Sequence, residues 1–151
     1  MNNSVSQELL KFLQKSPTAF HAVQQMKSEL LAVDFTEPKE NQRWNIECGK
    51  PYFVTRNDSS LIAFTIPENG IDKMHILTSH SDSPTFKIKE NPEIEVEKHY
   101  VKLNVEKYGG MLCAPWFDRP LSVAGRVIIK DKTNGQFTSK LVNIDRDLVM
   151  I

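Results

Sequence analysis

The N-terminal part of the chain carries two stripes of apolar residues at helical spacing, which predict two amphipathic helices. The sequence Ser16-Pro17-Thr18 separates them. Ser16 is expected to cap the second helix, with Pro17 at its first position, where a missing N–H costs nothing. We expect the second stripe to face a hydrophobic core, and we assign it no cofactor. The stripe residues are Val5, Leu9, Phe12 and Leu13 in the first helix and Phe20, Val23, Met26, Leu30 and Val33 in the second.

Strand-like segments follow the helices. The runs at 51–56 and 60–67 are separated by the turn-forming sequence Asn-Asp-Ser-Ser, so they predict a β-hairpin. The segment 73–80, KMHILTSH, contains a nearly continuous apolar run, which is typical of a strand covered on both faces by helices. Helices, a hairpin and a central strand together predict an α/β fold with a helix-flanked mixed sheet.

After Pro84 the pattern changes to an alternation of apolar and polar residues, which predicts an antiparallel β unit with one solvated face. The pair Asn134-Gly135 predicts a two-residue hairpin turn, and the sequence Asn-Pro-Glu at 91–93 predicts a turn near the boundary. We therefore expect part of a first domain over 1–88 and the start of a β-rich domain over 89–151. The alternating segments are 86–89, 94–97, 100–106, 121–130 and 137–144.

The composition narrows the class of protein. The 151 residues include 19 basic and 19 acidic side chains, so the net charge gives no reason to expect nucleic acid or an anionic membrane as a partner. A hydrophobic share of 40% and a charged share of 25% are typical of a globular protein. Cys48 and Cys113 form no C-x-x-C pair, which favours buried free thiols in a reducing compartment. We find no basic leader followed by an apolar stretch and no run near the ~20 residues of a membrane span, so a cytoplasmic location is expected.

His80 and Asp82 stand at the end of the apolar segment 73–80. Residues two apart in an extended chain project to the same side, and open α/β sheets bind ligands at the carboxyl ends of their strands. A neutral imidazole is a good zinc ligand, and a neighbouring carboxylate can accept its other N–H or reach the metal itself. The alternative is structural: His80 caps the strand end and Asp82 forms an Asx-turn ahead of Ser83-Pro84.

Three longer stretches carry a family resemblance: SPTAFHAV, TSHSDSPTFKIK and YGGMLCAPWFDRPLSVAGRV. In their order and spacing, from about Leu9 onward, the chain resembles the aspartyl aminopeptidase/aminopeptidase I family of dizinc metallopeptidases. The resemblance implies a catalytic α/β domain with two zinc ions at the carboxyl ends of its strands. It also implies an inserted β-rich domain that mediates subunit contacts, usually in dodecameric shells. The implied reaction is removal of an N-terminal acidic or neutral amino acid from a peptide substrate.

The resemblance also implies residue roles. His80 binds one zinc ion, and Asp82 supports the histidine by orienting its ring. The stretch WFDRPLSVAGR opens the inserted domain, where Asp118 and Arg119 are expected to be structural. Many relatives carry an aspartate where this chain has Pro120, a departure to which we attach no chemical role.

The family's other ligands come later in its sequence and include a pair of adjacent glutamates, one of which is the general base. This chain contains no Glu-Glu pair, whereas a catalytic zinc normally needs three protein ligands. His21, His75 and His99 are not expected to complete the site; His75 would point to the opposite face of the strand. We therefore expect an N-terminal piece of an enzyme, inactive when isolated.

Two other functions stay open from the sequence. Exposed edges of a β unit could make the chain a non-catalytic assembly module, with Trp116 and Phe117 as anchors, unless those rings pack inside the unit. The chain could also be a mononuclear metal-binding protein in which Asp82 is a ligand.

Overall fold

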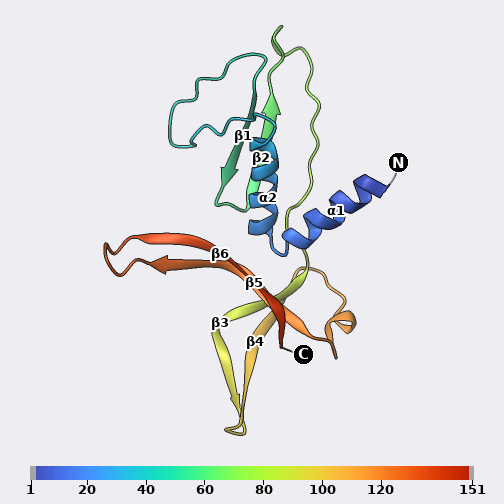
Figure 1. Ribbon diagram of the computed structural model, residues 1–151, viewed down its shortest axis with the longest axis vertical. Coiled ribbons are helices and arrows are strands. Elements are labelled where there is room, and N and C mark those ends of the chain that lie inside the picture. The colour runs from blue at the N-terminus through green and yellow to red at the C-terminus, as the bar shows by residue number, and fades with distance from the viewer. Residues whose placement is uncertain (1–2, 150–151) are drawn as a thin grey trace. The chain divides into compact units, whose positions relative to one another are not determined.

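The computed structural model describes residues 3–149; for residue 3 and residues 145–149 it describes the backbone alone. The elements follow one another as two helices and then a series of strands (Figure 1). They are α1 (Asn3–Lys15), α2 (Ala19–Leu31), β1 (Pro51–Arg56), β2 (Ser60–Thr65), β3 (Thr85–Val96), β4 (Tyr100–Tyr108), the 3₁₀ helix η1 (Ala114–Trp116), β5 (Leu121–Lys130) and β6 (Phe137–Val149).

The chain divides into two compact units, each with its own elements. The first comprises Met1–Asp82 and Ser122–Asp145, and the second comprises Ser83–Leu121 and Arg146–Ile151. Among the described residues the strands form three two-stranded sheets, β1–β2, β3–β4 and β5–β6. The α/β fold class expected from the sequence is confirmed. None of the described helices is long and apolar enough to cross a membrane.

Helix α2 begins after Thr18, so the expectation that Ser16 caps it is wrong. Thr18 has an extended backbone, and its side-chain oxygen accepts the backbone N–H of His21 at 3.4 Å. This oxygen satisfies one of the free N–H groups of the first helical turn, which is what an N-cap does. Pro17 therefore precedes the cap, and the Ser16 hydroxyl is buried with no hydrogen-bond partner among the described atoms.

The core of the first unit lies between α2 and the β1–β2 hairpin. Ala22 and Val23 of α2 and Tyr52 and Phe53 of β1 are the apolar residues that are buried in the described part of the chain. Helix α2 contacts β2, and the Tyr52 ring stacks on Phe64 with 5.8 Å between centroids. Phe53 is fully buried, and burying such a ring contributes about 1.5–3 kcal/mol. The second predicted stripe thus reaches the core through Val23.

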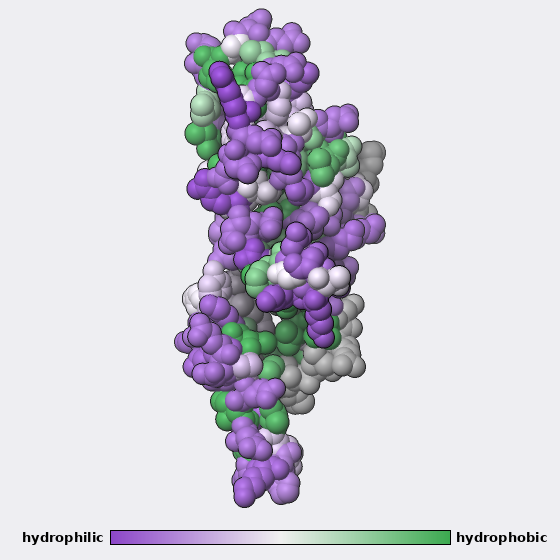
Figure 2. Space-filling model, turned by 90° about the vertical axis from the view of Figure 1, so that its left-hand side faces the viewer, coloured by the Kyte–Doolittle hydropathy of each residue, from purple (hydrophilic) through white to green (hydrophobic). Residues whose placement is uncertain are grey.

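The apolar stripe of α1 is largely exposed. Val5 is 70% exposed and Leu9 is 57% exposed, although α1 contacts α2. Exposed hydrophobic side chains are not confined to α1: Figure 2 shows others among hydrophilic side chains on the face that it draws. An amphipathic stripe is buried only where another element covers it, and among the described residues the contact with α2 leaves Val5, Leu9 and Leu13 mostly exposed.

The hairpin β1–β2 confirms the strand prediction at 51–67. Its strands pair antiparallel from Pro51 opposite Thr65 to Arg56 opposite Ser60. Asn57 and Asp58 at the turn have left-handed backbones, with φ of 53° and 52°. Two consecutive positive φ values match the twist of a tight hairpin, and Asn and Asp tolerate them well.

The predicted strand at 73–80 is wrong. This segment has no regular secondary structure, and Met74, Ile76 and Leu77 are 69%, 72% and 99% exposed. A strand is stable only when a neighbouring strand accepts its backbone hydrogen bonds. In the described part of the chain no strand pairs with this segment, so its apolar sequence alone does not make it a strand.

The second unit is built on the antiparallel hairpin β3–β4. The sequence 91–93, expected to form a turn, lies inside β3, where the register shifts between Ile88 and Glu93. That expectation is wrong because the strand absorbs the proline in a bulge instead of ending there. Trp116 of η1 packs edge-on against Phe86, with ring centroids 5.6 Å apart. The Trp116 ring therefore packs inside this unit, while Phe117 is 46% exposed.

Strands β5 and β6 form the hairpin expected around Asn134-Gly135, but their connection is longer than two residues. The loop spans 131–136. The Asp131 N–H donates to the Gln136 carbonyl at 2.8 Å, and the Gly135 N–H donates to the Asp131 carbonyl at 2.9 Å. Gly135 has a φ of 72°, the left-handed conformation that glycine adopts at little cost.

Candidate metal site

The candidate site consists of His80 and Asp82, which lie in the irregular stretch 71–84; His80 ends the segment 73–80, and both residues belong to the first unit. The His80 Nδ1 lies 2.8 Å from the backbone oxygen of Asp82 and 3.2 Å from the carboxylate Oδ1 of the same residue. A carbonyl oxygen can only accept a hydrogen bond, so Nδ1 must carry the proton. In a neutral imidazole the lone pair then lies on Nε2.

This geometry suits a metal ligand. The side chain of His80 is 81% exposed, so Nε2 is accessible to a metal ion. Zinc-binding histidines commonly donate their other ring N–H to a carboxylate or a backbone carbonyl, which fixes the tautomer and the ring orientation. The sequence prediction named the Asp82 carboxylate as the acceptor; the nearer acceptor is the Asp82 carbonyl. The residues fit zinc as one ligand with its orienting partner.

A single histidine does not complete a zinc site. In the part of the chain that the structure describes, no group of three His, Cys, Asp or Glu residues is placed to hold a metal ion. His75 is exposed in the irregular segment, so the prediction that it points to the opposite face of a strand loses its basis. His99 lies in the turn between β3 and β4, in the second unit.

His21 has a different environment, in the first turn of α2. Its Nδ1 lies 2.8 Å from the Thr18 hydroxyl oxygen, and partial burial lowers the pKa of its imidazole from 6.5. These contacts belong to the beginning of the helix. We find no described partner of His21 that marks it as a metal ligand.

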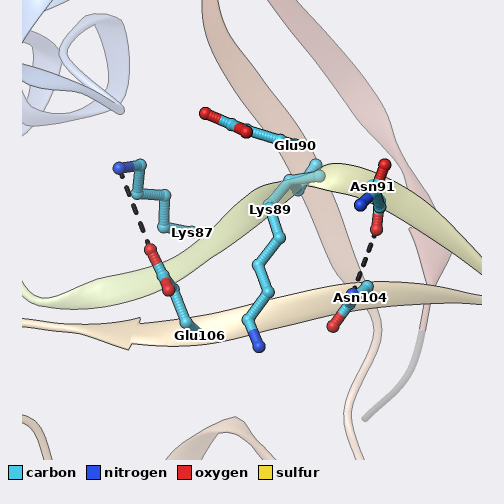
Figure 3. A pocket seen from close by; sticks show the side chains of 7 residues that line it. Lys87, Lys89, Glu90, Asn91, Asn104 and Glu106 are labelled. Atoms are coloured by element: carbon cyan, nitrogen blue, oxygen red, sulfur yellow. Dashed lines mark hydrogen bonds and ion pairs between the residues drawn. The ribbon is translucent and has the colours of Figure 1, made fainter.

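An open depression of about 380 Å³ lies on the β3–β4 hairpin (Figure 3). Lys87 pairs with Glu106 at 3.9 Å, and the Asn104 amide donates to the Asn91 carbonyl at 3.1 Å. The lining contains neither histidine nor cysteine, so we assign it no metal chemistry. It is formed by Lys87, Ile88, Lys89, Glu90, Asn91, Asn104 and Glu106.

Sequence reasoning gave no role to Ser81, which lies between the two site residues. Its hydroxyl donates to the carbonyl of Ser59 at 2.9 Å, across 22 positions of sequence. The alternation of side chains along an extended chain would have directed Ser81 away from its neighbours. No signal in the sequence identifies the Ser59 carbonyl as the partner of the Ser81 hydroxyl.

Comparison with known proteins identifies the family. The model of the aminopeptidase I zinc metalloprotease family (M18) matches residues 12–151. A probable M18 family aminopeptidase 2 of Clostridium novyi is 47% identical over 155 residues, which cover 100% of this chain and 36% of that protein. The chain belongs to the M18 family, as its motifs predicted. It spans about a third of the length of the curated relatives that it matches.

Solved structures agree with this assignment. The chain superposes with a TM-score of 0.93 on a chain in the cryo-EM structure of the Ape4 and Nbr1 complex, at 38% identity, covering 99% of this chain and 29% of that one. It matches the structure of the S. cerevesiae mApe1 dodecamer with a TM-score of 0.81 at 27% identity, covering 94% and 34%. The described elements therefore have the fold that family members show over the same part of their chains.

Proposed function

We propose that this chain is the N-terminal part of a zinc-dependent aminopeptidase, in which His80 binds a zinc ion through Nε2 and Asp82 orients the ring. The observation that carries the proposal is the contact of Nδ1 with the Asp82 backbone oxygen at 2.8 Å, which leaves Nε2 free on an exposed ring. Membership of a zinc metalloprotease family supports zinc as the metal. Zinc, when bound, supplies Lewis acidity toward the carbonyl of the peptide bond to be cleaved.

The site proposed for the parent protein holds two zinc ions, and this chain supplies one ligand to it. We propose that the other ligands and the general base come from the rest of the parent protein, since this chain spans about a third of the length of its curated relatives. The substrate is a peptide whose N-terminal amino acid, acidic or neutral, is released. The location proposed is the cytoplasm, in keeping with two free cysteines, although Cys48 is exposed and not buried as expected.

We further propose that residues 1–88 belong to the catalytic domain and that residues 89–151 begin the inserted β-rich domain through which subunits associate. The mApe1 relative is described as a dodecamer, which supports a homo-oligomer for the parent protein. Exposed apolar residues on β5 and β6, including Ile128 and Phe137, favour the second candidate function, an assembly module. Sedimentation of the isolated chain tests this role: self-association supports it and a clean monomer contradicts it.

Enzyme assays test the catalytic proposal. In the parent protein, a zinc chelator and the His80→Ala substitution should each remove aminopeptidase activity. The matched control is His75→Ala, since His75 is an exposed histidine of the same segment. Full activity of the His80→Ala protein would contradict the proposal.

The isolated chain should be inactive. It is assayed with acidic and neutral aminoacyl substrates in the presence of added zinc. Turnover of a few per second, within the ~1–1000 per second of ordinary enzymes, would contradict the expectation that its metal site is incomplete.

A further inference from the structure

The hydroxyl of Ser81 links the candidate metal site to the folded hairpin β1–β2. It donates a hydrogen bond to the Ser59 carbonyl at 2.9 Å, and the contact is partly buried. Ser59 lies in the turn between the two strands. The backbone that carries His80 is thus tied, one residue further on, to an element with a regular hydrogen-bond ladder.

The link matters because no described helix or strand contains His80. Residues 71–84 form neither helix nor strand, so no ladder of their own positions them. The His80 ring is mostly exposed, so packing does not hold it in place. Its contact with the Asp82 carbonyl is local: it orients the ring relative to its own backbone but does not place that backbone in the fold.

The Ser59 carbonyl, which accepts the Ser81 hydrogen bond, belongs to a turn that is fixed by further contacts. The Ser59 N–H donates to the Arg56 carbonyl at 3.2 Å, which closes the turn. Arg126 of β5 donates through Nη1 to the Asn57 carbonyl at 2.8 Å and to the Asn57 side-chain oxygen at 3.1 Å. The same guanidinium lies 4.1 Å from the centroid of the Phe20 ring on α2. Arg126 therefore joins β5, the hairpin turn and α2 within the first unit.

We propose that Ser81 and Arg126 are positioning residues for the zinc ligand His80. Ser81 ties the ligand's backbone to the hairpin turn, and Arg126 holds that turn in the conformation that presents the Ser59 carbonyl. The inference rests on the proposed function, since it needs His80 to bind zinc. Loss of the Ser81 hydroxyl lets the segment move, so the ring occupies its binding position for less of the time and zinc affinity falls.

The test uses the parent protein and measures the zinc dissociation constant by competition with a chelator. Ser81→Ala should weaken zinc binding roughly three- to tenfold, the range that one net hydrogen bond supports. Ser81→Thr keeps the hydroxyl and should restore the affinity. Ser83→Ala is the matched control, because Ser83 is exposed and no hydrogen bond of its hydroxyl is described. The melting temperature of the zinc-free protein separates a local effect from general unfolding.

Three outcomes overturn the role of Ser81: unchanged affinity in Ser81→Ala, a loss that Ser81→Thr does not restore, or an equal loss in Ser83→Ala. His80→Ala tells this inference apart from the function on which it rests. If His80→Ala binds zinc as the parent does, the proposed function fails. If it loses zinc while Ser81→Ala does not, the positioning role alone fails.

Arg126 is tested by its coupling to Ser81. Arg126→Lys keeps the charge but loses the planar guanidinium that lies over the Phe20 ring while donating to Asn57, so zinc affinity should fall about two- to fivefold. Both residues act through one turn, so the double variant should bind zinc about as well as Ser81→Ala alone. Fully additive losses would show that Arg126 acts elsewhere, and unchanged affinity in Arg126→Lys would remove it from the network.

Discussion

Replacing Asp82 with alanine tests how the imidazole of His80 is oriented. The substitution removes the carboxylate oxygen 3.2 Å from Nδ1 but keeps the backbone oxygen at 2.8 Å. Removing an orienting partner of a metal-binding histidine typically costs 10–100-fold in metal affinity. Because the shorter contact survives, the tautomer of His80 is retained, and the loss of zinc affinity should lie near the lower end of this roughly 10–100-fold range. We expect about tenfold, or roughly 1.4 kcal/mol.

The assay is chelator competition for zinc in the parent protein. Asp72→Ala is the matched control, because it removes an exposed carboxylate from the same irregular stretch, residues 71–84, and should leave the zinc affinity unchanged. A loss of more than about 100-fold would refute the reasoning, because it would make the Asp82 carboxylate a metal ligand or the principal orienting group. An unchanged affinity would refute it too, since the carboxylate would then contribute nothing to His80.

Three further predictions concern pH and stability. Because burial lowers the pKa of His21 below 6.5, its contribution to stability is complete above that pH and is lost as the pH falls through the folded-state pKa. His21→Gln should therefore flatten the loss of stability below pH 6.5 in chemical denaturation, and an unchanged slope would contradict this. Phe53→Ala should lower the free energy of unfolding by about 3–5 kcal/mol, because Phe53 is fully buried. Ile62→Ala, at an exposed position of the same hairpin, should lower it by less than about 0.5 kcal/mol. Similar losses in the two variants would mean that the core lies elsewhere. Thr18→Ala removes the cap of α2 and should lower the free energy of unfolding by about 1 kcal/mol. Ser16→Ala should be neutral or stabilising, because the Ser16 hydroxyl is buried without a described partner. A larger loss of stability in Ser16→Ala than in Thr18→Ala would make Ser16 the cap.

The features that the sequence predicted well depend on residues that are close to one another along the chain. The hairpin at 51–67 is correct because Asn57 and Asp58 accept the left-handed backbone that its turn requires. The two helices are correct because their stripes repeat every three to four residues, although the cap of the second lies two residues beyond Ser16.

The predictions that failed needed a distant partner. The apolar run at 73–80 has the composition of a buried strand, but composition cannot supply the neighbouring strand that would accept its hydrogen bonds. The sequence 91–93 resembles a turn, yet β4 continues opposite it and β3 passes through with a bulge. In both cases pairing decided the outcome, and pairing is not a local property.

The sequence by itself determined the family, through three motifs in order, and the choice of His80 and Asp82 as the residues to inspect, through their spacing of two. The tertiary structure decided which oxygen faces Nδ1, and it brought Ser59 to Ser81 across 22 positions and Asn57 to Arg126 across 69. The physical reason is the short range of the hydrogen bond. A hydrogen bond forms only near 3 Å, so partners far apart in the chain meet only where the folded backbone brings them together.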